Sequence, residues 1–227
     1  MKLQFLVAGI VAAISVGGPP RARGGTVYSQ PAVNGLSGFA SGFTEQQFIA
    51  DNFSLSAAAN VAAIHFWGNY SGTGVPSAPP AFRLRLYNAG SPIVNPTAFQ
   101  DVALTDVTRS PTALLTGSSI PIFEFTANLP ASVALSGSTT YYASLVDNTT
   151  DRWFWASSGP GTLYFRTTDS STDPWISSGV GNVAFELLDS PFAPNAVPLP
   201  TTVAAGLILL AFLSAGRLVT ARGSKSS

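Results

Sequence analysis

Short runs in which apolar and polar residues alternate recur throughout the middle of the chain, and they limit the fold more than any other feature. In the run 82–87, three apolar side chains share one face, while Arg83, Arg85 and Tyr87 share the other. The runs 122–125 and 183–187 alternate in the same way. Because successive side chains of a strand point to opposite faces, this period indicates strands that bury one face and expose the other to water.

Clusters of Gly, Pro, Asn, Asp and Ser separate these runs, for example at residues 71–74 and 157–161, and we find no convincing helical period between them. Short strands with turn residues between them predict an all-β fold. We expect a single antiparallel β-sandwich, jelly-roll-like, over residues 25–189. The chain has no cysteine, so this domain must be stabilised by packing without disulfides, and thiol chemistry and cysteine-ligated metals are excluded.

Charge is distributed unevenly along the chain. Residues 26–197 hold five arginines, no lysine and all 11 acidic residues, which gives them a net charge of −6. The other basic residues lie at the two ends. Affinity for nucleic acid depends on Lys and Arg that neutralise phosphates, so the acidic middle argues against a nucleic-acid partner.

The N-terminus has the pattern of a secretory signal peptide. Lys2 is followed by an apolar run over residues 3–16, which is too short for a comfortable membrane span. We therefore predict a signal peptide over residues 1–24, helical in its apolar part. The alternative is an uncleaved anchor, because Arg21 and Arg23 directly follow the run.

The C-terminus combines a proline motif, an apolar run and a basic end. Residues 190–196 form a proline-containing spacer, and the segment 197–227 follows it. A helix over residues 203–216 would be about 21 Å long and one over residues 199–219 about 31 Å, against a hydrocarbon core of about 30 Å. We predict a marginal transmembrane helix. The basic residues beyond it would stay on the cytoplasmic side and leave the acidic domain on the other; they are Arg217, Arg222 and Lys225.

This tail resembles the PEP-CTERM sorting domain of Gram-negative bacteria in its Val-Pro-Leu-Pro variant, here Val197, Pro198, Leu199 and Pro200. The resemblance implies export across the inner membrane, tethering in the membrane, and processing at the motif by an exosortase, a membrane-embedded transpeptidase. It also implies a place in the cell envelope or extracellular matrix of bacteria that form biofilms and produce exopolysaccharide. Leu199 stands where the commonest motif has Glu, and Thr201 where this variant usually has Ala. The alternative is a permanent anchor without processing.

The middle of the chain carries no catalytic motif. His65 is the only histidine, which excludes histidine-paired metal sites, and no Gly-x-Ser-x-Gly sequence accompanies it. It is either a general base or ligand, or a strand residue on the polar face or at the core edge. A secreted glycosidase would need two carboxylates across a cleft, for which Glu45, Glu124 and Glu186 are candidates by residue type alone.

The tryptophans suggest a carbohydrate platform. Trp153 and Trp155 fall on one face of a strand, with Phe154 on the other, and Trp67 and Trp175 complete the set. Indoles that face solvent can stack on the apolar faces of sugars such as an exopolysaccharide. The alternative is that these indoles are core residues of a domain that has no disulfides.

Two pairs of aspartates lie in loops and are weak calcium candidates: Asp147 with Asp151, and Asp169 with Asp173. Aspartates in turns also bond to their own backbone, which is the alternative. We expect no cofactor other than this calcium.

Together these patterns predict an exported, non-enzymatic surface or matrix protein that is sorted through its C-terminal motif. A carbohydrate-binding module for exopolysaccharide is the alternative, and a secreted glycosidase is the third. The expected partners are the membrane, an exosortase-like enzyme and an exopolysaccharide.

Overall fold

Fifteen strands and no helix make up the part of the chain that the computed structural model describes, residues 25–72, 76, 79–90, 94–179 and 181–192. All pairs of these strands are antiparallel, so the predicted all-β class with antiparallel sheets is confirmed. Within these ranges no helix is long and apolar enough to cross a bilayer. The predicted signal helix (1–24) and transmembrane segment (197–227) lie outside the described residues.

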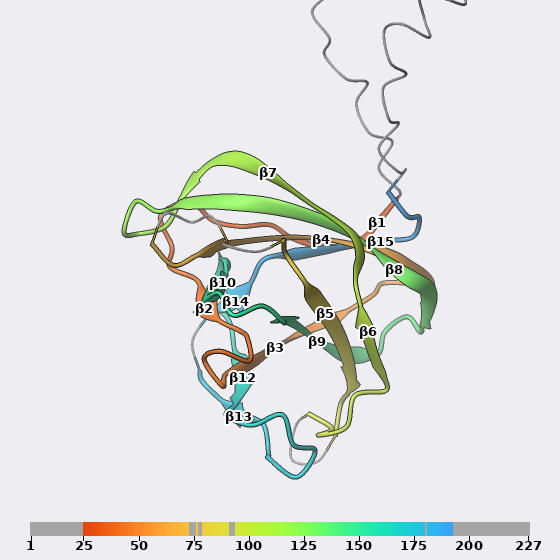
Figure 1. Cartoon of the computed structure of the whole chain (residues 1–227). Helices are drawn as coiled ribbons and strands as arrows, with labels where there is room; N and C mark the ends of the chain where they lie inside the picture. The colour runs from red at the N-terminus through yellow and green to blue at the C-terminus, as the bar shows by residue number, and fades with distance from the viewer. Residues whose placement is uncertain (1–24, 73–75, 77–78, 91–93, 180, 193–227) are drawn as a thin grey trace, which may run out of the picture. The chain divides into compact units, whose positions relative to one another are not determined.

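The first sheet has seven strands: β1 (Thr26–Gln30), β2 (Phe39–Ala40), β4 (Ala59–Tyr70), β7 (Thr105–Leu115), β8 (Pro121–Leu135), β10 (Trp153–Trp155) and β15 (Phe185–Leu188). β4 is its central strand. It pairs with β8 on one side, and with both β15 and β10 on the other. β1, β2 and β7 extend the sheet beyond β15, β10 and β8 respectively (Figure 1).

The second sheet has six strands in the order β13-β12-β3-β9-β5-β6. Their bounds are β3 (Phe48–Ser54), β5 (Phe82–Asn88), β6 (Gln100–Ala103), β9 (Thr140–Asp147), β12 (Leu163–Arg166) and β13 (Ile176–Ser177). A small third sheet pairs β11 (Ser157–Gly159) with β14 (Asn182–Val183).

The two large sheets share one hydrophobic core, to which the apolar faces of their strands contribute. Phe66 of β4 stacks on Phe125 of β8, with ring centroids 5.1 Å apart and planes 5° from parallel. Phe82 of β5, in the second sheet, meets Phe66 edge-on at 5.0 Å, and Trp153 of β10 meets Phe82 at 5.0 Å. Aromatic rings therefore pack the two sheets together. They supply the large buried area that a domain without disulfides needs for stability.

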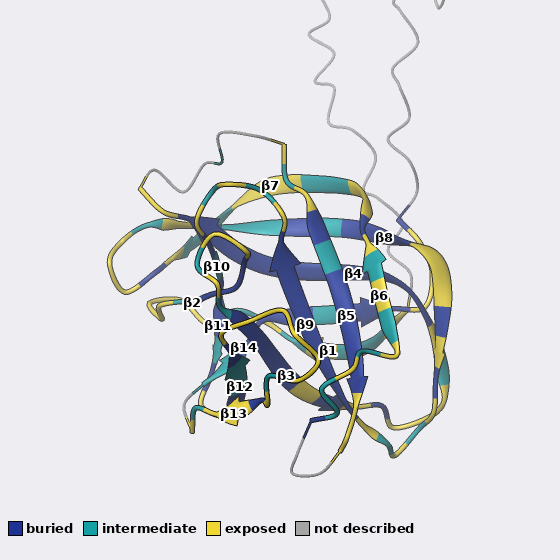
Figure 2. Ribbon diagram, turned by 60° about the horizontal axis from the view of Figure 1, so that its bottom comes forward, coloured by how far each residue is buried: buried dark blue, intermediate teal, exposed yellow. Residues whose placement is uncertain are grey.

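Burial reaches further than the alternation predicted. β3, β4, β5 and β9 are buried over most of their length (Figure 2). The expectation of a water-exposed second face on the run 82–87 is wrong for Arg85 and Tyr87, which are 6% and 1% exposed. The physical reason is a second layer of side chains and loop, in which Val94 and Trp175 pack on the outer face of the second sheet.

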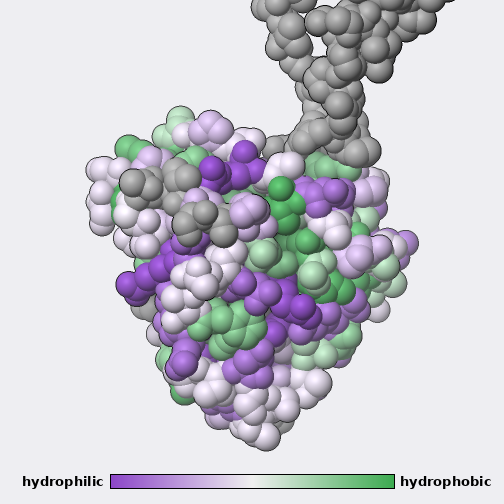
Figure 3. Space-filling model, viewed as in Figure 1, coloured by the Kyte–Doolittle hydropathy of each residue, from purple (hydrophilic) through white to green (hydrophobic). Residues whose placement is uncertain are grey.

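The surface of the domain mixes hydrophobic and hydrophilic residues. On the face seen in Figure 3, hydrophobic residues form small patches bordered by hydrophilic ones. The large apolar side chains that remain exposed, among them Phe43, Phe99 and Leu115, are between 37% and 51% exposed. Scattered apolar side chains are normal on a protein surface and become informative where polar groups converge on them.

Replacing Phe125 by Ala should lower the free energy of unfolding by about 3–5 kcal/mol, because it leaves a cavity at the aromatic contact between the sheets. Leu115→Ala, at an exposed site, should change it by less than about 0.5 kcal/mol. Urea unfolding followed by tryptophan fluorescence measures both. Equal losses in the two variants would contradict the assignment of Phe125 to the centre of the core.

Candidate functional site

The four tryptophans do not form an exposed platform. Trp153 and Trp155 are 0% exposed and belong to the shared core, while Trp67 and Trp175 are 8% and 5% exposed. β10 directs its two indoles inward, and the indole nitrogen of Trp155 donates to the carbonyl of Ala184 at 2.8 Å. The core interpretation therefore describes these residues, and a sugar has no indole face to stack on.

His65 lies between two carboxylates on the outer face of the first sheet. Its Nδ1 is 3.0 Å from Oε2 of Glu186 on β15, and its Nε2 is 3.3 Å from Oε2 of Glu124 on β8. The imidazole is 1% exposed and lies against the ring of Trp67, with centroids 4.1 Å apart. The hydroxyl of Ser29 donates to Oε1 of Glu186 at 2.7 Å.

This bridge joins three neighbouring strands and gives two of the glycosidase candidates a common partner. Glu124 and Glu186 converge on one imidazole rather than facing each other across a hollow. The third candidate, Glu45, is an ion partner of Arg152, at 3.5 Å from its Nε. The structure therefore brings two of the three acids together, with His65 in the space between them.

The calcium candidates accept hydrogen bonds from protein groups. Asp147 accepts from the backbone nitrogen and the hydroxyl of Thr149, as the turn-capping alternative expects, and burial raises its pKa to about 6. Asp173 accepts hydrogen bonds from the backbone nitrogen and the hydroxyl of Thr168. The bond from the backbone nitrogen of Thr168 holds the pKa of Asp173 below its usual value. Among the described residues, no three His, Asp or Glu side chains are grouped so that they could hold a metal ion. Asp151, the partner of Asp147 in that prediction, lies in the same loop.

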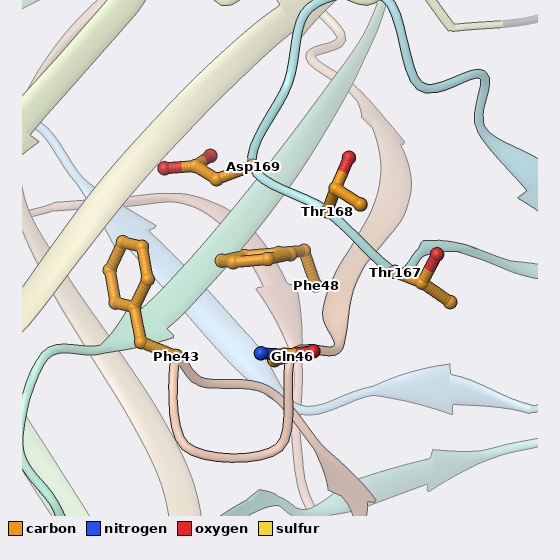
Figure 4. A pocket seen from close by; sticks show the side chains of 6 residues that line it. All are labelled: Phe43, Gln46, Phe48, Thr167, Thr168 and Asp169. Atoms are coloured by element: carbon orange, nitrogen blue, oxygen red, sulfur yellow. The ribbon is translucent and has the colours of Figure 1, made fainter.

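A hollow on the outer face of the second sheet brings polar groups and an exposed aromatic ring together. We call it the Phe43 pocket; its volume is about 280 Å³, and its walls are Phe43, Gln46, Phe48, Thr167, Thr168 and Asp169. Figure 4 shows the carboxylate of Asp169 and the amide of Gln46 on opposite sides of the Phe48 ring, with Phe43 near the end of that ring. The two rings meet edge-on, with centroids 5.3 Å apart.

One wall of the pocket is the tight turn that leads into β3. The backbone nitrogen of Gly42 donates to the carbonyl of Gln47 at 2.9 Å, and that of Gln46 donates to the carbonyl of Phe43 at 3.2 Å. Gln46 has a φ of 49°, in the left-handed region where residues other than glycine are uncommon. The turn leaves Phe43 37% exposed and Phe48 2% exposed.

The opposite wall is the loop that follows β12. Oδ2 of Asp173 accepts from the backbone nitrogens of Thr167 and Thr168, at 3.1 and 2.8 Å, and from the hydroxyl of Thr168 at 3.0 Å. The carboxylate of Asp173 therefore fixes the loop. Asp169, which directly follows Thr168, is thereby oriented toward the sheet.

Two buried arginines hold Asp169 in place. Arg85 donates from Nη1 to Oδ1 and from Nη2 to Oδ2, the second at 2.9 Å, and Nη2 of Arg166 lies 3.4 Å from Oδ1. Burial disfavours the charge of Arg85, but the bonds to Asp169 and the charge of Asp101 raise its pKa. Both guanidinium groups also lie over the Phe48 ring, at 5.7 and 5.9 Å from its centroid.

A second hollow, of about 250 Å³, adjoins the first and shares Asp169 with it. Arg85, Asp101 and Arg166 line it, together with residues 96–98. The side chain of Asp169 thus lies where the two hollows meet, and 37% of it is exposed.

Of the residues that line this pocket, only Asp169 could be predicted as a site residue from the sequence, and the predicted role was calcium binding. Phe43 and Gln46 lie in a turn, where no periodic pattern reports on function. The available signal was the pair Arg83 and Arg85 on one face of a strand, because charged residues on a strand need opposite charges nearby.

Comparison with protein-family models, with curated proteins and with solved structures finds no match for this chain. Its function is therefore inferred from the residues of the chain itself.

A buried acid, Asp51 of β3, connects the two large sheets. It is 0% exposed, and its Oδ2 accepts from Nε2 of Gln30 on β1 at 2.7 Å and from the backbone nitrogen of Val183 at 2.9 Å. Burial raises the pKa of Asp51 to about 6, against the opposing effect of these bonds. The ionised form is therefore less stable in the folded state than in water.

The variant Asp51→Asn should remove a pH dependence of stability. The pKa of Asp51 lies above its unfolded value of 3.8, so its favourable contribution is complete below about pH 4 and is lost as the pH rises through about 6. Between pH 4 and 7 the wild type should lose about 3 kcal/mol relative to the variant, whose amide oxygen can still accept both hydrogen bonds. Urea unfolding of both proteins across this range measures the difference, and a constant difference would contradict it.

Proposed function

We propose that the chain is an exported, non-enzymatic surface or extracellular-matrix protein that is sorted through its C-terminal motif. The observation that supports this is the order of signals in the sequence: a signal peptide over residues 1–24, an acidic β domain, a spacer (190–196) and a sorting segment (197–227). The described residues supply one compact all-β unit between these signals. In its finer detail the domain is a jelly-roll-like β-sandwich.

The route follows from the same residues. The basic end with Arg217, Arg222 and Lys225 keeps the C-terminus cytoplasmic, and the apolar run holds the chain in the inner membrane. An exosortase-like enzyme then acts at the motif 197–200, and the domain remains in the envelope or matrix. This role needs no metal or organic cofactor.

Deleting residues 197–227 should release the protein from the cell envelope into the medium or periplasm, because the chain then lacks its membrane segment. Fractionation of cells with antibody detection measures this. The double variant Pro198→Ala/Pro200→Ala tests the motif alone and should leave the tail uncleaved, as mass spectrometry of the C-terminus reports. Pro191→Ala/Pro194→Ala in the spacer is the matched control. Unchanged retention of the protein at the cell surface after the deletion would contradict the proposal.

A second candidate function is carbohydrate binding, as a module for exopolysaccharide. The Phe43 pocket favours it, because an exposed phenyl ring lies beside a carboxylate, an amide and two threonines. A sugar ring presents apolar C–H groups on its faces and hydroxyls around its edge, which match such a surface. This candidate fits the same destination, since exopolysaccharide surrounds the envelope of the bacteria that the tail implies.

The full-length protein, purified in a detergent without a sugar headgroup, should bind extracellular polysaccharide prepared from the cells that produce it. Co-sedimentation with the polysaccharide measures this, and the protein unfolded in urea serves as the control. Recovery of all the folded protein in the supernatant at saturating polysaccharide would reject the carbohydrate-binding role.

A further inference from the structure

We propose that the Phe43 pocket binds an uncharged pyranose unit of a polysaccharide chain, with Phe43 as the stacking surface and Asp169 as the acceptor of sugar hydroxyls. This inference rests on the carbohydrate-binding role proposed above and assigns it a site and a ligand class. The site lies on the outer face of the second sheet, and none of the four tryptophans lines it.

The aromatic surface is the first argument. Phe43 is 37% exposed, although an edge contact with Phe48 and the guanidinium of Arg85, 5.8 Å from its centroid, support its ring. A ring that is supported on one side and open on the other can stack on the apolar face of a sugar at little cost in side-chain entropy. The cavity of about 280 Å³ is near the lower end of the range of small-ligand sites, which suits one sugar ring.

The carboxylate of Asp169 is the second argument. Two carboxylate oxygens offer about four acceptor sites. Three guanidinium N–H groups, two from Arg85 and one from Arg166, use three of these sites. The side chain is still 37% exposed, so acceptor capacity remains for a hydroxyl on the pocket side. The arginines fix the carboxylate before the ligand arrives, which reduces the entropy lost on binding.

The charges around the site favour a neutral ligand. Arg83, Asp101, Arg85, Asp169 and Arg166 form a ladder of alternating charge along the outer face. Asp101 lies 2.9 Å from Nε of Arg83 and 3.3 Å from Nε of Arg85. The three guanidinium groups share two carboxylates, which leaves a net charge of only +1. Each guanidinium therefore has a carboxylate beside it, and the ladder offers no unpaired charge to an acidic sugar or a basic ligand.

The backbone of Gln46 is the third argument. A φ of 49° at a residue other than glycine costs about 1–2 kcal/mol relative to its preferred conformation. This conformation places the amide at the wall of the pocket opposite Asp169 (Figure 4). An amide can donate to one sugar oxygen and accept from another hydroxyl. Gln46 and Asp169, on opposite sides of the Phe48 ring, can therefore both bind hydroxyls at the edge of one sugar.

The neighbouring hollow indicates a chain rather than a free monosaccharide. It begins at Asp169 and continues past Asp101 and Thr97 with a volume of about 250 Å³. A polysaccharide whose one unit stacks on Phe43 would lay the adjacent unit into this second hollow. Affinity should therefore increase with the number of units until both hollows are filled.

The test uses the full-length protein in a detergent without a sugar headgroup and isothermal titration calorimetry. The probes are neutral glycans (dextran, mannan and galactan) and acidic ones (alginate and polygalacturonate). We expect saturable binding to at least one neutral glycan that persists at 0.5 M NaCl, a concentration at which exposed charges are screened over roughly 5 Å. Binding of acidic glycans alone would overturn the ligand class.

Phe43→Ala should weaken binding of that glycan by about tenfold, because it removes the stacking surface. The matched control is Phe99→Ala, a phenylalanine that is 40% exposed and outside both hollows. Gln46→Gly should also weaken binding while leaving the midpoint of unfolding unchanged or higher, because glycine relieves the backbone strain. Asp169→Asn would leave the buried Arg85 with a weaker partner and could unfold the protein. Its glycan binding is therefore interpreted only if the variant keeps the circular dichroism spectrum of the wild type.

The outcomes separate the two proposals. If the wild type binds none of the probes or the native polysaccharide, the carbohydrate-binding role fails and the site fails with it. If the wild type binds but Phe43→Ala and Gln46→Gly bind equally well, the role stands and the Phe43 pocket is overturned as its site. Loss in both pocket variants, with retention in Phe99→Ala, supports the inference.

Discussion

The contact between Phe66 and Phe125 is the interaction on which the rest of the fold depends. These stacked rings of the first sheet receive the edge of Phe82 from the second sheet, and Trp153 closes the group. A domain without disulfides must obtain its stability from buried area, and aromatic side chains bury the most area per residue. The tryptophans are therefore used to stabilise the fold and are not available as a binding surface.

With the inner faces committed to the core, functional groups are left to the outer faces, and the two sheets differ there. The first sheet carries His65 between Glu124 and Glu186, a bridge across three strands. The second carries the charge ladder and the aromatic layer around Arg166, whose guanidinium stacks on Trp175 at 4.6 Å. On the second sheet, part of this layer lines the Phe43 pocket, which lies between the turn at Phe43 and the loop at Asp169 (Figure 4).

The fold class could be predicted because alternation acts locally. The runs 82–87, 122–125 and 183–187 became β5, part of β8, and β14 with β15, with the expected apolar faces inward. The wet second face was predicted wrongly at Arg85, because a period of two does not show whether a distant loop will cover the outer side. For the same reason, alternation does not show which face of the strand with Trp153 and Trp155 points inward.

The sequence by itself determined the all-β class, which residues share a strand face, the charge segregation and the order of the segments at the two ends, since each depends on residues that are neighbours in the chain. Only the tertiary structure decided that the indoles are core and that His65 has two acidic neighbours. It also placed a turn at Phe43 beside a loop at Asp169, more than 120 residues later. A pocket needs groups from distant segments, and their approach is set by how the sheets pack and by buried ion pairs such as Arg85 with Asp169, which no local pattern records.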